Sequence, residues 1–354
     1  GGDISWTRQQ GLRDGTFPGR GESFPTRAFP VTDFTLGGLF VSDEITLLDG
    51  ALTLFPALRF DFYDLNPTDD PLLTTFVPQG QSDSRLSPKF GATLKLAPEV
   101  FLFGNYAQGF LAPTPSQVNN FFEFIAGGYT SIPNPDLRPE TSESFEAGAR
   151  YVGDVFSLQL TAFRGDYDNF ISQQVIRGAF TPQDPAIFQF VNFAGARIEG
   201  IEARAEMKLD NGITGRFAMA YADGDTFDAA GTRLPLDTID PFNLVASLGY
   251  RDPQGRFGGE LILTHNARKE AGELERAGDG TDLFVRPGAS TILDLTAFVA
   301  VTDALKLRAG IFNLTNETYA LWSDVRGLRV ADAGILHAFT RPGRNLSVSA
   351  SYRF

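Results

Sequence analysis

The end of the chain, residues 346–354, reads LSVSASYRF, and its hydrophobicity alternates residue by residue. Leu346, Val348 and Ala350 alternate with serines, so an extended strand here has one apolar face and one polar face. A period of two indicates a β-strand and not a helix. Similar runs lie at 51–62, 89–96, 142–151, 155–162, 201–208, 213–221, 243–250, 291–301 and 305–311. Together they predict about thirteen strands of about 10–16 residues each.

Short turns and long connections alternate between these runs. Residues favoured in tight hairpins mark the short turns, as in Asp210-Asn211-Gly212 and Asp252-Pro253-Gln254-Gly255. The long connections lie at roughly 66–84, 111–137, 172–188, 226–236, 268–286 and 316–337. Strands of about twice the usual soluble length, with short turns on one side and long loops on the other, predict an all-β, antiparallel transmembrane β-barrel. A soluble propeller would need a blade repeat, and a β-sandwich would place long loops at both ends.

Composition excludes several classes of function. The chain has 354 residues and a net charge of −13, with 33 Phe, 2 His and no Cys. Without Cys there is no disulfide framework, thiolate metal site or cysteine nucleophile, and two His leave little room for a metal centre. The negative charge argues against nucleic acid as a partner. No nucleophile motif or phosphate-binding glycine loop is present, so we expect no enzyme activity, no catalytic residue and no intrinsic cofactor.

Several segments resemble those of TonB-dependent outer-membrane receptors. They read YAQGFLAP at 106–113, NPDLRPETSESFEAG at 134–148, NLTNETY at 313–319 and PGRN at 342–345. They occur in the order expected for the family, and the resemblance covers about 30–354. The residues that carry the main motif are Phe110, Ala112, Pro113, Asn134, Pro135, Asp136, Leu137, Pro139 and Glu140. The two prolines at 135 and 139 favour an extended entry into a strand, so a structural role for this motif is the simpler interpretation.

The resemblance implies a receptor in the bacterial outer membrane that imports a scarce solute. In this family a 22-stranded barrel is plugged by an N-terminal domain, and the TonB complex acts through that N-terminal part. We therefore expect residues 33–354 to be the C-terminal part of the barrel, about 13 of 22 strands, and residues 1–32 to be the remnant of an extracellular loop, with the plug absent. The implied partners are outer-membrane lipid, lipopolysaccharide, the TonB complex and an iron chelate.

Within the family, the paired FLAP (110–113) and NPDL (134–137) boxes resemble the haem and haemoglobin receptor branch. That branch places a haem-binding His between the boxes, but residues 114–133 contain none. Tyr129 is the candidate iron ligand in its place, and Phe121, Phe122 and Phe124 are candidates for stacking on a flat macrocycle. His337, just before the final strand, is a further candidate ligand. An apolar loop that folds onto the barrel mouth explains the same aromatic residues without a ligand.

Two classes of function stay open at this stage. The first is energised uptake of an iron source, with haem or a haem protein favoured over a siderophore, cobalamin or a carbohydrate. The second is passive diffusion through a porin-like channel. Long external loops and the family segments favour the first class.

Overall fold

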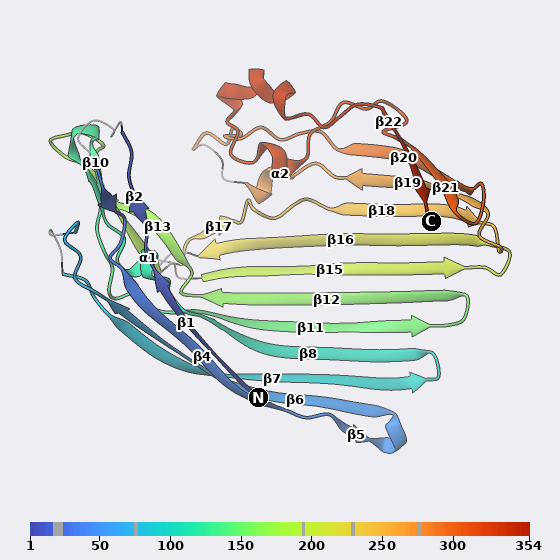
Figure 1. Ribbon diagram of the computed structural model, residues 1–354, viewed down its shortest axis with the longest axis horizontal. Helices are drawn as coiled ribbons and strands as arrows, with labels where there is room; N and C mark the ends of the chain where they lie inside the picture. Colours follow the sequence, from blue (N-terminus) through green and yellow to red (C-terminus); the bar gives the residue numbers. More distant parts are fainter. Residues whose placement is uncertain (17–23, 74–76, 193–194, 228–230, 275, 277) are drawn as a thin grey trace.

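One large antiparallel sheet dominates the computed structural model, which describes residues 1–16, 24–73, 77–192, 195–227, 231–274, 276 and 278–354 (Figure 1). It is a 16-stranded sheet in which each long strand pairs with the next long strand along the chain. The long strands are β1 (Gly2–Gln9), β4 (Thr32–Ser42), β6 (Leu52–Pro67), β7 (Gln81–Ala97), β8 (Val100–Leu111), β11 (Glu140–Val152), β12 (Phe156–Asp168), β15 (Gly195–Lys208), β16 (Ile213–Phe227), β18 (Asn243–Arg251), β19 (Phe257–Asn266), β20 (Ser290–Ala300), β21 (Leu305–Phe312) and β22 (Asn345–Tyr352). Two short strands, β5 (Ile45–Leu47) and β17 (Arg233–Pro235), pair with β6 and β16.

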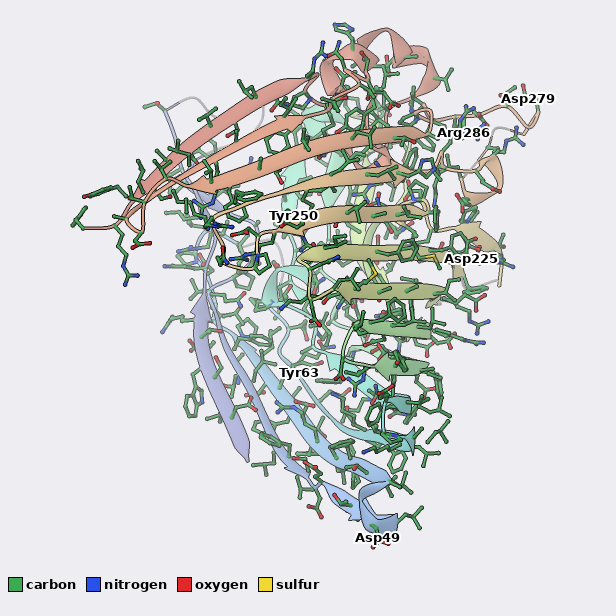
Figure 2. All side chains as sticks on the ribbon, turned by 90° about the vertical axis from the view of Figure 1, so that its right-hand side faces the viewer. Asp49, Tyr63, Asp225, Tyr250, Asp279 and Arg286 are labelled. Carbon is green, nitrogen blue, oxygen red and sulfur yellow. The ribbon has the colours of Figure 1, made fainter. Side chains whose placement is uncertain are left out.

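The sheet is strongly curved and open. Figure 2 shows it wrapped around an interior that holds Tyr63. Within the described residues, β1 and β22 form its two edges, because each pairs with one neighbour alone. Unpaired edges expose backbone groups that lipid cannot satisfy, so a wall of this kind is stable in a membrane only as part of a closed barrel.

The two faces of the sheet differ as the alternation predicts. Leu160 and Ile201 are 48% and 47% exposed on one face, while Gln159 and Thr161 lie on the other. The molecule exposes 21010 Å² of surface, whereas a globular protein of this mass exposes roughly 14,000 Å². The apolar face is therefore not the core of a soluble sandwich. None of the described helices is long and apolar enough to cross a membrane.

Short and long connections lie on opposite sides of the sheet. The hairpins between β7 and β8, β11 and β12, and β15 and β16 gather at one end of the strands (Figure 1). Gly212 and Gly255 sit in such turns with φ of 91° and 73°, which a residue with a side chain rarely adopts. The long connections leave from the other end and carry the small elements of the fold. The predicted long loops are thus confirmed.

The small elements are short and irregular. They are β2 (Leu12–Arg13), β3 (Thr26–Arg27), η1 (Leu48–Gly50), α1 (Pro115–Val118), β9 (Phe122–Phe124), η2 (Ile125–Gly127), β10 (Tyr129–Ser131), β13 (Ile171–Arg177), β14 (Ala186–Asn192), η3 (Ala271–Glu273), α2 (Trp322–Val325) and η4 (Val330–Phe339). All except η1 belong to the long-loop side. This side of the sheet, called the loop side below, therefore holds most of the structure outside the barrel wall.

The N-terminal segment departs from the expectation of a loop at 1–32. Residues Gly2–Gln9 form β1, which pairs with β4 in an antiparallel arrangement. The register is unbroken from the pair of Gln9 with Thr32 to the pair of Gly2 with Leu39. Ile4 and Trp6 alternate here with polar residues, a pattern too short to identify as a strand before its partner is known. The expected loop is therefore confined to the residues between β1 and β4, of which 17–23 lie outside the described residues.

Candidate functional site

Two long loops combine into one small sheet on the loop side. Strands β9 and β10 come from the connection between β8 and β11, whereas β13 and β14 come from the connection between β12 and β15. The strand order is β13-β14-β10-β9, with β10 parallel to β14. We call this four-stranded unit the loop sheet (Figure 1). Because its halves come from different loops, neither loop can form it alone.

An aromatic cluster lies on the loop sheet around Tyr129. The centroid of the Tyr129 ring is 5.6 Å from that of Phe122, 5.2 Å from that of Phe124 and 6.4 Å from that of Phe188, and each pair is edge-on. Phe180 packs edge-on against Phe188 at 6.0 Å. The structure therefore brings together three of the predicted ligand residues, Tyr129, Phe122 and Phe124. Phe180 and Phe188 were missed in the sequence because they belong to the other loop, and no local pattern pairs them with Tyr129.

Gly128 allows the two loops to approach each other closely. Its φ is 80°, and a Cβ at this position would lie 2.5 Å from the carbonyl oxygen of Phe180. The amide of Ala186 donates to the Gly128 carbonyl oxygen at 2.9 Å, next to the parallel pairing of β10 and β14. Glycine is therefore required where the tip of one loop meets the other.

The other two predicted ligand residues lie outside this cluster of rings. Phe121 precedes β9, and its amide donates to the carbonyl oxygen of Ala28 at 2.7 Å. His337 lies in η4, in the connection between β21 and β22, where its exposed Nδ1 is 3.1 Å from the carbonyl oxygen of Gly334. No hydrogen bond between described residues links His337 to Tyr129.

Part of the motif is built into a buried core beneath the loop sheet. Ala112 and Leu137 are buried there with Phe34, Tyr63, Leu65 and Val118, and Phe110 packs against this cluster. Pro113 is also fully buried. Burial of Tyr63 and Leu65 from β6 against these loop residues fastens the loop to the inside of the wall. The loop thus folds onto the barrel mouth.

Asparagine side chains join the loops to one another through backbone groups. Asn119 is fully buried; its Oδ1 accepts from the Gln79 amide at 3.0 Å and its Nδ2 donates to the Gln79 carbonyl at 2.9 Å. Asn134 of the motif donates through Nδ2 to the Phe190 carbonyl at 2.8 Å. Asn192 makes the same two-way contact with Arg138, at 2.8 Å in each direction. These amides replace ladder hydrogen bonds that irregular loops lack.

Two further motif residues help to hold this arrangement. The Glu140 carboxylate accepts from the amide of Ile171, at the start of β13, at 2.8 Å. Asn134 also accepts from the Asp136 amide at 3.1 Å, which closes the turn around Pro135. Pro139 sits directly before β11 and is buried. These contacts join the motif to the start of β13 and close its own turn.

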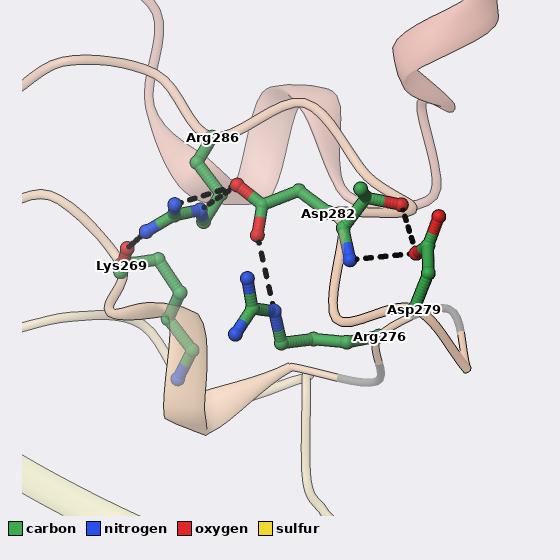
Figure 3. Close-up of polar contacts among 6 residues, drawn as sticks. Lys269, Arg276, Asp279, Asp282 and Arg286 are labelled. Carbon is green, nitrogen blue, oxygen red and sulfur yellow. Dashed lines mark hydrogen bonds and ion pairs between the residues drawn. The ribbon is translucent and has the colours of Figure 1, made fainter.

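A second group of loops is held largely by charge. It comprises the connections 267–289 and 313–344, and we call it the ion-paired cluster. Arg286 donates through Nε to Asp282 at 2.9 Å and through Nη1 to the Lys269 carbonyl at 3.1 Å (Figure 3). Arg276 lies 3.5 Å from the other Asp282 oxygen. The guanidinium of Arg286, followed by that of Arg276, lowers the pKa of Asp282 below its ordinary value.

Trp322 joins the ion-paired cluster to the connection between β17 and β18. It is buried with Leu274, Ala320 and Val325, and its Nε1 donates to the Asp237 carbonyl at 2.7 Å. The buried Lys269 donates to the Ile239 carbonyl at 2.9 Å and lies 3.5 Å from Glu273. A cavity of about 210 Å³ lies beside these residues, lined also by Asn243 and Asn266. Among the described residues, no group of three or more His, Asp or Glu side chains is placed to hold a metal ion.

The chain matches the family model described as TonB dependent receptor-like, beta-barrel, over residues 1–314. It is 27% identical over 305 residues to the hemoglobin and hemoglobin-haptoglobin-binding protein of Haemophilus ducreyi, covering 75% of this chain and 31% of that protein. The chain thus spans about a third of the length of this curated relative.

Solved structures share the fold. The copper transporter OprC superposes with a TM-score of 0.70 at 20% identity, over 91% of this chain and 48% of that one. The FrpB iron transporter from Neisseria meningitidis superposes with a TM-score of 0.68 at 15% identity, over 92% and 46%. The chain therefore belongs to the TonB-dependent receptors, β-barrel proteins of the bacterial outer membrane, and contributes part of the barrel wall.

Proposed function

We propose that the chain is part of a receptor for the energised uptake of an iron source, with haem or a haem protein as the preferred cargo. The observation that carries this proposal is the relationship to a hemoglobin and hemoglobin-haptoglobin-binding protein over 75% of the chain. The structural neighbours support the fold alone, since a copper transporter and an iron transporter share it. Transport then needs no chemical step on the cargo, and we propose no enzyme activity.

The aromatic cluster of the loop sheet is the proposed contact for the cargo. Tyr129 is half-buried among Phe122, Phe124 and Phe188, on loops that overhang the barrel wall. A phenolate oxygen is an established protein ligand for haem iron, and aromatic rings pack well against a flat macrocycle. Tyr129 takes the role of iron ligand in this proposal, and the phenylalanines shield the macrocycle from water. His337 lies in the ion-paired cluster, so in this proposal it would contact the cargo from that second group of loops.

The remaining partners follow from the family. The apolar outer face contacts outer-membrane lipid, including lipopolysaccharide, and the TonB complex supplies energy through the N-terminal part of the receptor. Energised uptake differs from porin-like diffusion in one measurable respect. Uptake by a TonB-dependent receptor stops when the TonB complex is removed, whereas diffusion continues.

The direct test is a haem titration of the full-length receptor, in which the absorbance of bound haem is measured at each step. Loss of a coordinating oxygen leaves haem held by packing alone, so we expect Tyr129→Phe to weaken binding about tenfold or more. Tyr221→Phe is the matched control, because Tyr221 lies on the outer face of β16 and belongs to neither of the two loops that form the loop sheet. Wild-type absorbance and affinity in the Tyr129 variant would remove it as the ligand.

Growth assays then separate the classes of cargo. A strain that relies on this receptor should grow on haem or haemoglobin as its iron source, and should stop growing when TonB is deleted. Growth on a ferric siderophore, cobalamin-dependent growth or growth on a carbohydrate would assign a different cargo. Continued uptake without TonB would assign a passive channel.

A further inference from the structure

Three connections enclose a small cavity on the loop side, beside the ion-paired cluster. The cavity has a volume of about 210 Å³, and its walls come from the residues before β18, the connection between β19 and β20, and α2 with the residues before it. Asp240, Gly288 and Ser323 of the lining are exposed, so the cavity opens to the outside of the molecule. Among the described residues, the lining includes no ring of the aromatic cluster around Tyr129. The cavity is therefore separate from the proposed contact for the cargo.

A buried ammonium group belongs to the lining of this cavity. The side chain of Lys269 is 1% exposed, and its Nζ donates to the Ile239 carbonyl oxygen at 2.9 Å. The carboxylate of Glu273 is 3.5 Å from Nζ, farther than the distance of about 2.7–2.9 Å in a strong hydrogen bond between opposite charges. An ammonium has three N–H donors, so one hydrogen bond and one loose ion pair leave it incompletely satisfied. Because a buried charge is costly unless it is paired and hydrogen-bonded, a further acceptor at Nζ would stabilise this site.

The rest of the lining has a polar part and an apolar part. Pro241, Pro287 and Leu321 supply apolar surface, whereas Asn243 and Asn266 supply amide groups. The Asn243 Nδ2 donates to the Asn266 Oδ1 at 2.7 Å, which holds the two amides side by side. Water alone can satisfy the ammonium but gains nothing from the apolar surface. A molecule with one anionic end and an apolar body uses both parts of the lining.

The size of the cavity limits the ligand. At about 30 Å³ for each water molecule of the liquid, the cavity holds about seven waters. A ligand that fills the same space has about seven to nine non-hydrogen atoms. Haem is far larger, so the preferred cargo of the receptor does not fit here. The exposed carboxylate of Asp240 at the opening disfavours a second negative charge on the ligand.

We propose that this cavity binds a small monocarboxylate with an aliphatic body, either a short-chain fatty acid or an aliphatic amino acid. The ligand carboxylate accepts a hydrogen bond from Lys269 Nζ, which gains a close anionic partner beside the loose pair with Glu273. The aliphatic body packs against Pro241, Pro287 and Leu321. The bound acid touches three connections at once, so binding stabilises the ion-paired cluster. This inference does not rest on the identity of the cargo.

The first experiment is a calorimetric titration of the full-length receptor in detergent micelles. The probes are hexanoate and leucine, each compared with its own amide, which keeps the size and removes the carboxylate. We expect at least one of the two acids to bind with a Kd below about 10 mM, and its amide to bind about tenfold or more weakly. Stronger binding of hexanoate identifies a fatty acid site, and stronger binding of leucine an amino acid site. A Kd above about 10 mM for both acids, or equal binding of acid and amide, would overturn the inference.

A pair of variants then connects binding with the cavity. Lys269→Met removes the ammonium and should weaken binding of the acid about tenfold or more. Arg268→Met is the matched control, because Arg268 is the neighbouring cation but is exposed and does not line the cavity. Its affinity for the acid should stay within about twofold of the wild-type value. An equal loss in both variants would assign binding to the general charge of the loop and would contradict the proposal.

A third variant keeps the test valid if Lys269→Met disturbs the loop. Ala267→Leu fills part of the cavity and leaves Lys269 in place, so the acid should bind about tenfold or more weakly. Hydrogen exchange around α2 should stay at least as protected as in the wild type, because the variant fills empty space. Wild-type affinity for the acid in this variant would overturn the inference. Haem titration of the same variants should give the wild-type affinity, so this inference and the proposed function fail independently.

Discussion

The loop sheet and the ion-paired cluster solve the same problem in different ways. Each must hold long loops above the barrel wall without a large core of its own. The loop sheet uses backbone pairing and the neutral amides of Asn119, Asn134 and Asn192. The ion-paired cluster uses Asp282 with Arg286, together with the buried Trp322. Salt and acid should therefore act mainly on the second region, because the amides of the first carry no charge and its one carboxylate contact described above is that of Glu140 with the Ile171 amide.

The two regions also differ in how deeply their polar contacts are buried. Asn119 is fully buried, and removing it leaves a donor and an acceptor of Gln79 without partners. The pair formed by Arg341 and Asp324 lies at the surface, where water replaces lost contacts at little cost. Variants in the two regions should therefore rank by burial and not by the number of hydrogen bonds.

The largest effect is expected from Asn119→Ala. Both hydrogen bonds to Gln79 are lost in a buried site, so local opening of the loop between β8 and β11 should become easier by about 2–4 kcal/mol. Hydrogen exchange of peptides covering β9 and β10 measures this change. Asn105→Ala is the control, because Asn105 is exposed and makes one long contact to Glu146 at 3.4 Å. Equal protection in both variants would show that Asn119 does not hold the loop.

The sequence predicted the barrel wall better than the loop sheet for a physical reason. A strand that spans a membrane must alternate over its whole length, so stretches such as 201–208 reveal their faces locally. β1 is short, and its alternation became decisive only through pairing with β4. The loop sheet depends on β10 meeting β14, which lie far apart in the chain. No periodic pattern encodes that meeting.

The candidate site was predicted in part for the same reason. Tyr129, Phe122 and Phe124 were selected as aromatic residues in one loop, and the structure places them in contact. Phe188 completes the cluster from another loop and carried no signal of its own. His337 was selected as an isolated residue, and chain order alone does not determine which loops meet above a barrel. Its role stays a prediction for the haem titration.

A smaller effect is expected from Trp322→Phe. Phenylalanine keeps most of the buried ring but loses the Nε1 donor to the Asp237 carbonyl, which should loosen the ion-paired cluster by about 1–2 kcal/mol. Hydrogen exchange around α2 reports the change. Trp6→Phe is the control, because Trp6 lies exposed on β1. Loss of protection in the loop sheet as well would contradict the separation of the two regions.

Arg341→Gln should have a smaller effect that depends on salt. Its guanidinium donates to Asp324 at 2.7 Å through Nε and at 2.6 Å through Nη2, but both groups are partly exposed. We expect a loss of about 0.5–1 kcal/mol at low salt that fades in about 0.5 M NaCl. Exchange measured at two salt concentrations tests this. If salt acted equally on β9 and β10, the comparison of neutral and ionic loops would fail.

Acid should weaken the ion-paired cluster, and we expect this effect to be the smallest of those proposed. The folded pKa of Asp282 is lowered by Arg286 and Arg276, so its contribution to stability is present above the unfolded pKa of about 4. That contribution is lost as the pH falls through the lower, folded pKa. Protection around 276–286 should therefore decrease below about pH 4, while the amides of Asn134 and Asn192 do not titrate. Asp282→Asn should remove this pH dependence, because an amide in its place has no proton to gain. A pH response that persists in that variant would assign the acid sensitivity to other carboxylates of the cluster.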